Sequence, residues 1–239
     1  MRQAGLRGIL FDKDGTLFDY HGTWTPILTE AAELVARGRG ALVPDMLAAI
    51  GYDQGTGRFA AGSIAGAGDT FGLADAWLAI AGGWERGALV RELDSIFARE
   101  APLRSLPVTG LADFFASLKA KGFFLGIATN DVAASASATG ARFGFATFLD
   151  FSAGYDSGYG QKPGPGMALA FCAATGLVPG EVAVVGDNCH DLEMGRRAGA
   201  GLNVGVLSGT GGRADLEPLA DHVIESITDL PALLDRLAR

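Results

Sequence analysis

The stretch Arg7-Gly-Ile-Leu-Phe-Asp-Lys-Asp-Gly-Thr-Leu17 determines how the rest of the sequence is interpreted. Its apolar start, residues 7–11, is short and continuous, which is typical of a strand buried on both faces of a parallel sheet. Asp12 and Asp14 follow at once, and Gly15 closes a tight turn. The motif can be an ordinary Asp/Gly turn, or it can present two carboxylates together at the end of a strand.

Two later apolar runs end in polar residues in the same way. Residues 123–128 lead into Thr129, and residues 182–186 lead into Asp187. Helical patterns lie between the strands, at residues 111–121, 132–139, 165–175 and 192–198. Strands and helices that alternate at this spacing predict a doubly wound, Rossmann-like α/β parallel sheet. Ligands bind at the carboxyl ends of the strands in such sheets, so the polar residues found there are candidates for a functional site.

The region after the first strand has a different pattern. It contains three helical patterns and a glycine-rich stretch, residues 51–72, and no convincing strand; the helical patterns are residues 25–36, 71–80 and 87–99. We therefore expect a mostly helical cap domain at residues 18–103. It would be inserted into a core domain formed by residues 1–17 and 104–239.

Composition narrows the possible partners. The chain has 239 residues, of which 49% are hydrophobic, as in a globular protein. Its formal net charge of −8 repels nucleic acid and anionic membranes, so neither is an expected partner. We find no signal peptide, no membrane span and no CxxC pair, and therefore expect a cytoplasmic protein. No feature of the sequence indicates an oligomeric state.

The polar residues at the predicted strand ends suit phosphoryl transfer. A carboxylate such as Asp12 can attack phosphorus and form an acyl phosphate that water cleaves. A second carboxyl group, Asp14, can protonate the leaving oxygen and later deprotonate the water. Thr129 and Asn130 can be a simple helix cap, or they can offer a hydroxyl and backbone N–H groups to phosphate oxygens. Lys162 can be a solvated lysine before a helix, or a cation that offsets the charge of the phosphate and of Asp12.

Asp187 and Asp191 allow two interpretations as well. They can be a strand-end turn and an acid at a helix N-terminus, or part of a Mg²⁺ site. Mg²⁺ prefers oxygen ligands and is held by one or two protein carboxylates together with several waters. Asp12, Asp187 and the Asp14 carbonyl would provide such a site, and Asp191 would either join it or orient Lys162.

Taken together and in this order, these residues resemble the four motifs of the haloacid dehalogenase superfamily. Residues 12–16 are similar to the first motif, Thr129 to the second, Lys162 to the third, and Asp187 with Asp191 to the fourth. The helical insert is similar to the C1 cap of the phosphoglycolate phosphatase and β-phosphoglucomutase subgroup. The resemblance implies a Mg²⁺-dependent phosphatase that acts on a small phosphorylated metabolite through an aspartyl phosphate. It also implies that the phosphate is held by Thr129, Lys162 and backbone groups near Gly15 and Asn130.

Other chemistries within this superfamily are less well matched. Its dehalogenases lack the second acid, whereas Asp14 is present here. Its phosphonate hydrolases need a cap lysine, and residues 18–103 contain none. A phosphomutase uses the same core residues and stays open as an alternative. So does a catalytically inactive binding module, although none of the expected acids is missing.

Selectivity for the substrate is expected to come from the cap. Arg58 lies in the flexible segment Gly55-Thr-Gly-Arg-Phe, and a guanidinium group suits a carboxylate, which favours a phosphoglycolate-like acid as substrate. An exposed arginine without a role is the alternative. Lys13 is expected to point away from its two neighbouring aspartates. His190 is expected to fill space or face solvent. Trp24 is expected to pack in the cap, with lining of the substrate pocket as the alternative.

Overall fold

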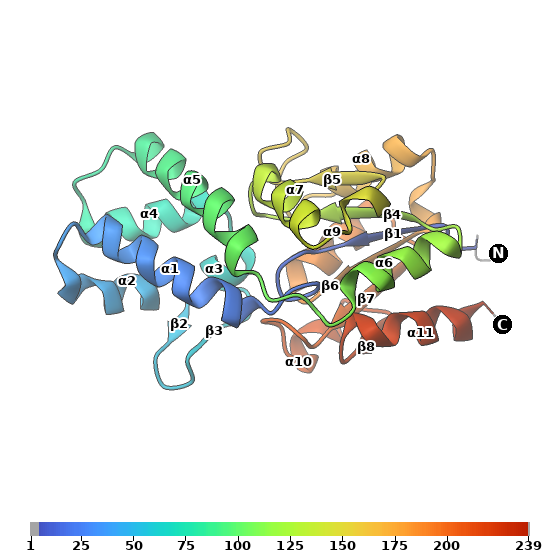
Figure 1. Cartoon of the computed structure of the whole chain (residues 1–239). Helices are drawn as coiled ribbons and strands as arrows, with labels where there is room; N and C mark the ends of the chain where they lie inside the picture. The colour runs from blue at the N-terminus through green and yellow to red at the C-terminus, as the bar shows by residue number, and fades with distance from the viewer. Residues whose placement is uncertain (1–4, 239) are drawn as a thin grey trace.

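The computed structural model describes residues 5–238 (Figure 1). Six strands form one sheet, in which every neighbouring pair is parallel and the spatial order is β5-β4-β1-β6-β7-β8. The strands are β1 (Gly8–Phe11), β4 (Phe124–Ala128), β5 (Phe151–Ala153), β6 (Val182–Gly186), β7 (Leu202–Val206) and β8 (His222–Ile224). This confirms the predicted doubly wound parallel sheet.

The strand order places the candidate residues. After β1, in the middle of the sheet, the chain builds outward through β4 and β5 and then returns to add β6, β7 and β8 on the other side. The order therefore reverses between β1 and β6, and a crevice opens at such a switch point beyond the carboxyl ends of the two strands. Asp12 follows β1 and Asp187 follows β6, so the topology brings these two side chains to the same place.

Helices cover both faces of the sheet. Ile9 and Phe11 point to one face and pack in a cluster with α6 (Leu111–Ala120) and α11 (Leu230–Leu237). Leu10 points to the other face and packs in a cluster with α8 (Gly166–Thr175) and α9 (Cys189–Ala198). Successive side chains of a strand alternate between faces, which is why the continuous apolar run of β1 supplies both clusters. Two further helices complete the core, α7 (Ala133–Arg142) and α10 (Arg213–Leu216).

The segment between β1 and β4 forms a separate helical body beside the carboxyl ends of the strands (Figure 1). Its elements are α1 (Tyr20–Ala36), α2 (Val43–Ala49), β2 (Tyr52–Asp53), β3 (Arg58–Phe59), α3 (Ile64–Ala67), α4 (Thr70–Ala81) and α5 (Arg86–Arg104). A hydrophobic cluster of its own runs from Tyr20 to Ala101 and includes the fully buried Trp77. Phe18, by contrast, packs in the core cluster beside Phe143 and Phe145.

The segment is mostly helical, as predicted, but it also contains two short strands that the sequence did not indicate. Strands β2 and β3 pair as an antiparallel hairpin within the glycine-rich stretch. Each has only two residues, too few to show the alternation by which a strand is recognised. The Asp53 side chain holds the hairpin turn by accepting a hydrogen bond from the Thr56 N–H at 2.8 Å.

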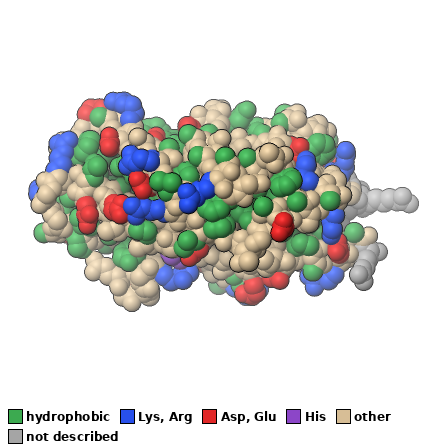
Figure 2. All heavy atoms as spheres, in the orientation of Figure 1, with side chains coloured by type: hydrophobic (Ala, Val, Ile, Leu, Met, Phe, Trp, Pro, Cys, Tyr) green, Lys and Arg blue, Asp and Glu red, His purple; other side chains and the backbone are tan. Residues whose placement is uncertain are grey.

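The cap has a charged surface. Basic and acidic side chains lie interspersed over the face that Figure 2 shows. An exposed ion pair of the cap joins Arg86 to Asp75 at 2.6 Å. Within residues 5–238, no helix is both long and apolar enough to span a membrane.

Candidate active site

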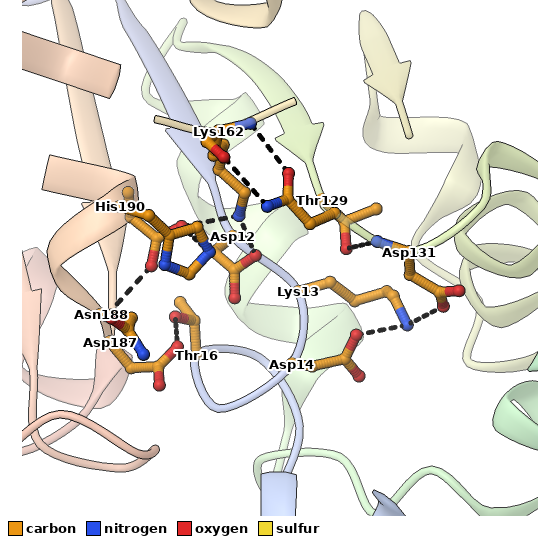
Figure 3. Close-up of polar contacts among 12 residues, drawn as sticks. Asp12, Lys13, Asp14, Thr16, Thr129, Asp131, Lys162, Asp187, Asn188 and His190 are labelled. Atoms are coloured by element: carbon orange, nitrogen blue, oxygen red, sulfur yellow. Dashed lines mark hydrogen bonds and ion pairs between the residues drawn. The ribbon is translucent and has the colours of Figure 1, made fainter. Parts of the chain in front are cut away.

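Three of the predicted residues meet at the end of the central strands. The Lys162 ammonium group lies 2.5 Å from Asp12 Oδ1 (Figure 3) and 2.6 Å from Asp191 Oδ1, and all three residues are buried. The loop before α8 thus delivers its lysine to carboxylates that follow β1 and β6. Burial opposes the charged form of Lys162, but the two carboxylates outweigh it and raise the pKa of the ammonium group. Lys162 is therefore a fixed cation beside Asp12.

Lys13 forms a second cluster of charges, contrary to expectation. Its fully buried side chain points away from Asp12, but its ammonium group contacts Asp14 Oδ2 at 2.7 Å and Asp131 Oδ2 at 3.0 Å. The prediction that Lys13 points away from both aspartates was wrong for Asp14. The reason is Asp131, which lies 118 residues further along the chain and supplies a second carboxylate inside the protein.

Asp187 is held by neutral groups only. Its Oδ2 accepts hydrogen bonds from the Thr210 N–H at 2.8 Å and the Thr210 hydroxyl at 3.2 Å, and its Oδ1 accepts one from the Thr16 hydroxyl at 3.3 Å. The loop of residues 207–212, after β7, therefore forms part of the site. Sequence reasoning missed this loop, although Ser208-Gly-Thr-Gly-Gly212 at the end of a strand is a recognisable signal.

Gly15 differs from its predicted role. Its N–H donates to the Phe18 carbonyl at 2.7 Å, because the loop after β1 folds back on itself, so this group is not free to bind a phosphate. Gly15 has a positive φ of 92°, and a Cβ atom there would lie 2.6 Å from the Asp187 carboxylate. Glycine is thus required by the close approach of Asp187 and by the backbone conformation.

Thr129 and Asn130 lie where the sequence predicts, directly after β4. The Thr129 hydroxyl accepts a hydrogen bond from the Asp131 N–H at 3.1 Å and keeps its own proton available. The Asn130 side chain binds both backbone groups of Lys162, at 2.9 and 3.2 Å, and so positions that lysine. Within the described chain, the Asn130 N–H has no hydrogen-bond acceptor.

A cavity separates these residues from the cap. On the core side it is lined by Asp12, Asp14, residues 129–131 and His190. On the cap side the lining residues are aromatic, aliphatic or small, together with one acid: Tyr20, Trp24, Leu28, Ile64, Ala65, Gly66, Gly68, Asp69, Thr70, Leu73 and Phe97. Trp24 therefore does line the cavity, and its buried indole N–H has no partner among the described residues.

Arg58 does not belong to this lining. It lies on the β2–β3 hairpin, where its guanidinium group is 3.5 Å from the Gly209 carbonyl of the core. The cap side of the cavity contains no lysine and no arginine within the described chain. The predicted contact between Arg58 and the substrate therefore has no support from the geometry.

His190 was expected to fill space or face solvent, but it lines the cavity. Its Nε2 lies 3.5 Å from Asp191 Oδ1, and its side chain is 12% exposed. Burial and the neighbouring Lys162 lower the pKa of His190 to about 3, so the ring is neutral near neutral pH. His190 therefore adds no charge to the site.

The site holds more negative than positive charge. Five carboxylates, namely Asp12, Asp14, Asp131, Asp187 and Asp191, face two ammonium groups, which leaves an excess of three negative charges when all are ionised. Burial raises the pKa of Asp12 to about 6 against the opposing effect of Lys162. Burial and the neighbouring Asp12 and Asp191 raise the pKa of Asp187 well above its usual value.

A divalent cation fits this arrangement. Oxygens of Asp12, Asp187 and Asp191 lie within 4.8 Å of one another, and Asp187 has no cationic side-chain partner among the described residues. Oxygen-rich sites with few protein carboxylates are typical of Mg²⁺. Asp191 also fixes the loop after β6, because its Oδ2 accepts a hydrogen bond from the Asn188 N–H at 3.0 Å.

The fold and the site define a class of protein, a doubly wound α/β protein with a helical cap beside a buried acidic site that a divalent cation fits. The model of the haloacid dehalogenase-like hydrolase family matches residues 6–199, which are most of the chain. The chain belongs to this family of hydrolases, and the resemblance seen in its sequence is confirmed.

Several relatives of the chain are named as phosphatases. The probable phosphatase IndB of Dickeya dadantii is 35% identical over 125 residues, which span 51% of this chain and only 54% of that protein. An N-acetylmuramic acid 6-phosphate phosphatase of Pseudomonas aeruginosa is 25% identical over 99% of this chain and 98% of its own. The crystal structure of a predicted phosphoglycolate phosphatase from Haemophilus somnus has the same fold, with a TM-score of 0.73 at 19% identity, covering 98% of this chain and 99% of that chain.

Proposed function

We propose that this chain is a Mg²⁺-dependent phosphatase that hydrolyses a small phosphate monoester through a phosphorylated Asp12. One observation carries the proposal: Asp12 and Asp14 face the same cavity, but each belongs to a different cluster of charges. Lys162 contacts Asp12, whereas Lys13 contacts Asp14. Two carboxylates in unlike surroundings can take the two different roles that phosphoryl transfer needs.

The reaction has two halves. In the first, an Asp12 carboxylate oxygen forms a bond to phosphorus, the ester P–O bond breaks, and the leaving oxygen takes a proton from Asp14. In the second, Asp14 removes a proton from water, the water oxygen bonds to phosphorus, and the bond to Asp12 breaks. Inorganic phosphate is released and both carboxyl groups return to their starting state.

The remaining residues hold the phosphate. The Thr129 hydroxyl and the Asn130 N–H are donors of residues that line the cavity, and Lys162 would add its buried ammonium group, which contacts the lining residue Asp12. Asp12, Asp187, Asp191 and the Asp14 carbonyl would hold Mg²⁺. When bound, the ion would neutralise the excess negative charge and polarise the phosphoryl group. Positioning and electrostatic stabilisation supply most of the rate enhancement in such reactions.

The cavity suits a substrate whose non-phosphate part is uncharged. Its cap side offers aromatic and aliphatic surface, the Asp69 carboxylate and the unpartnered indole N–H of Trp24. Hydroxyl groups of a substrate can donate to the Asp69 carboxylate and accept from the Trp24 indole N–H. A carboxylate would meet no cation there, so a neutral, hydroxyl-bearing phosphate ester is a better candidate than a phosphoglycolate-like acid.

The same cap wall favours a phosphatase over a phosphomutase. A mutase has to hold a bisphosphate, and a second phosphate would need positive charge on the cap side of the cavity. An inactive binding module is also disfavoured, because every acid that the mechanism requires is in place.

The two cysteines are free, which supports a reducing, cytoplasmic setting.

A panel of phosphate esters tests the proposal. Neutral sugar phosphates, phosphorylated carboxylic acids, sugar bisphosphates and an aryl phosphate should be assayed for phosphate release with Mg²⁺ and with EDTA. We expect Mg²⁺-dependent release that is fastest for a neutral ester. No release from any ester would refute the phosphatase, and formation of an isomeric sugar phosphate without release would establish the mutase.

A further inference from the structure

The two oxygens of the Asp14 carboxyl group have different surroundings. Oδ2 lies 2.7 Å from the Lys13 ammonium group. Oδ1 is buried and has no hydrogen-bond partner within residues 5–238. Asp14 lines the cavity, and Oδ1 is its oxygen without another partner among the described residues. A carboxyl group that is held by one oxygen in this way cannot turn freely about its Cβ–Cγ bond.

Lys13 is itself fixed from several directions. Its ammonium group contacts Asp131 Oδ2 at 3.0 Å and lies 5.6 Å from the centre of the Trp24 ring. Asp131 is fixed in turn, since its Oδ1 accepts the Val132 N–H at 2.8 Å and its own N–H donates to the Thr129 hydroxyl. The chain of contacts therefore connects Asp14 to the loop that follows β4.

A buried lysine at this position would lower the stability of the folded protein if it only filled space. Its fully buried ammonium group must give up hydration, and only well-placed carboxylates offset that cost. An apolar side chain would have filled the same volume without that cost. What the lysine adds is a directed contact to a single oxygen of Asp14.

We propose that Lys13, anchored by Asp131, is a positioning residue that directs Asp14 Oδ1 toward the leaving oxygen of the substrate. This inference rests on the proposed phosphatase function. Lys13 does not touch the substrate in this scheme; it acts through Asp14. Its contribution is therefore greatest for substrates that depend on protonation of the leaving group.

Two variants and two substrates test the role. Lys13→Met removes the contact, and Asp131→Asn keeps the shape of the anchor but removes its charge. Each is assayed with a reactive alkyl phosphate from the panel and with an aryl phosphate, whose leaving group needs little protonation. A misplaced acid should lower kcat for the alkyl ester about 10²-fold and for the aryl ester much less, with KM for both nearly unchanged.

A double variant separates positioning from a general loss of structure. In the Asp14→Asn background, Lys13→Met should cause no further loss of kcat, because the group that it positions is already inactive. Lys119→Met is the matched control: it breaks an ammonium–carboxylate pair with Asp150 at 2.8 Å, far from the cavity, and should leave both substrates unaffected.

The outcomes are decisive in either direction. Selective loss on the alkyl ester, absent in the Asp14→Asn background, supports the positioning role. Equal loss on both esters, or additive loss in the double variant, overturns it. Should Lys13→Met fail to fold, as circular dichroism would show, the isosteric Asp131→Asn variant decides alone. Absence of Mg²⁺-dependent activity in the wild type would instead overturn the proposed function on which this inference rests.

Discussion

Replacing Asp187 with asparagine should make the metal-free protein more stable and, at the same time, reduce its response to Mg²⁺. Asp187 is buried beside Asp12 and Asp191, and its own hydrogen-bond donors are all neutral. An asparagine can keep these contacts. Its oxygen would accept from the Thr210 N–H, and its amide group would donate to the Thr16 hydroxyl, which can accept as well as donate.

The sign of the effect follows from the raised pKa of Asp187. A carboxyl group whose pKa is higher in the folded than in the unfolded protein lowers the stability of the folded state above the unfolded pKa of 3.8. The loss of stability grows with pH until the pH passes the raised pKa of the folded state. Single stabilising substitutions commonly gain about 0.5–2 kcal/mol. For a chain of 239 residues, this corresponds to a rise in Tm of about 1–8 °C. The gain should be largest at alkaline pH and vanish near pH 4.

Mg²⁺ should reverse the ranking. A ligand present at 100 times its Kd stabilises the folded state by about 2.7 kcal/mol, or roughly 5–10 °C for a protein of this size. The wild type should show this rise, and the variant, which lacks one carboxylate of the site, should show a smaller one. Thermal unfolding at pH 8 in EDTA and in Mg²⁺ measures both effects.

A matched variant guards against a general effect of removing charge. Asp150→Asn loses a carboxylate that Lys119 does contact and that accepts the Leu125 N–H, so it should not raise the Tm. The reasoning would be refuted by an Asp187→Asn variant that is no more stable than the wild type in EDTA. An unchanged response to Mg²⁺ would separately exclude Asp187 as a ligand.

Three further predictions concern activity. Asp12→Asn should abolish Mg²⁺-dependent phosphate release from every ester, since an amide is a poor nucleophile; substantial turnover by a folded variant would contradict a phosphorylated Asp12. Gly209→Ala would place a Cβ atom 2.0 Å from Asp187 Oδ2. We therefore expect kcat/KM to fall about 10²-fold, and a metal titration to show that the activity depends less strongly on Mg²⁺. Arg58→Ala should change kcat/KM for a phosphorylated acid and for an aryl phosphate by the same factor, because Arg58 lies outside the cavity; a loss confined to the acid would reinstate it as a specificity residue.

The sequence predicted the sheet and the residues at its strand ends because both depend on short local patterns. The runs before Asp12, Thr129 and Asp187 are continuous and apolar, and parallel strands bring their carboxyl ends to one edge. The partners of Lys13 could not be predicted in this way. Its orientation depends on Asp131, which only the folded sheet brings near.

The details of the cap were hard to predict for a related reason. The hairpin strands are too short for their period to be seen, and Arg58 was chosen because it stands in a flexible segment. Flexibility in the sequence does not say which way a loop faces. In the structure the hairpin faces the loop of residues 207–212, and the helices α1, α3, α4 and α5 supply the wall of the cavity instead.

The distribution of charge explains why five similar acids can have different tasks. Lys162 is shared by Asp12 and Asp191, and Lys13 by Asp14 and Asp131, so each lysine compensates one carboxylate of its pair and leaves the pair negative. Asp187 has no lysine at all. A divalent cation bound near Asp12 and Asp187 would therefore correct the imbalance in the first cluster and leave the second with its excess charge. In the proposed mechanism, the second cluster contains the carboxylate of Asp14, which would gain and lose a proton in each cycle. Separation of the two lysines would then let one side of the cavity hold the metal while the other side transfers protons.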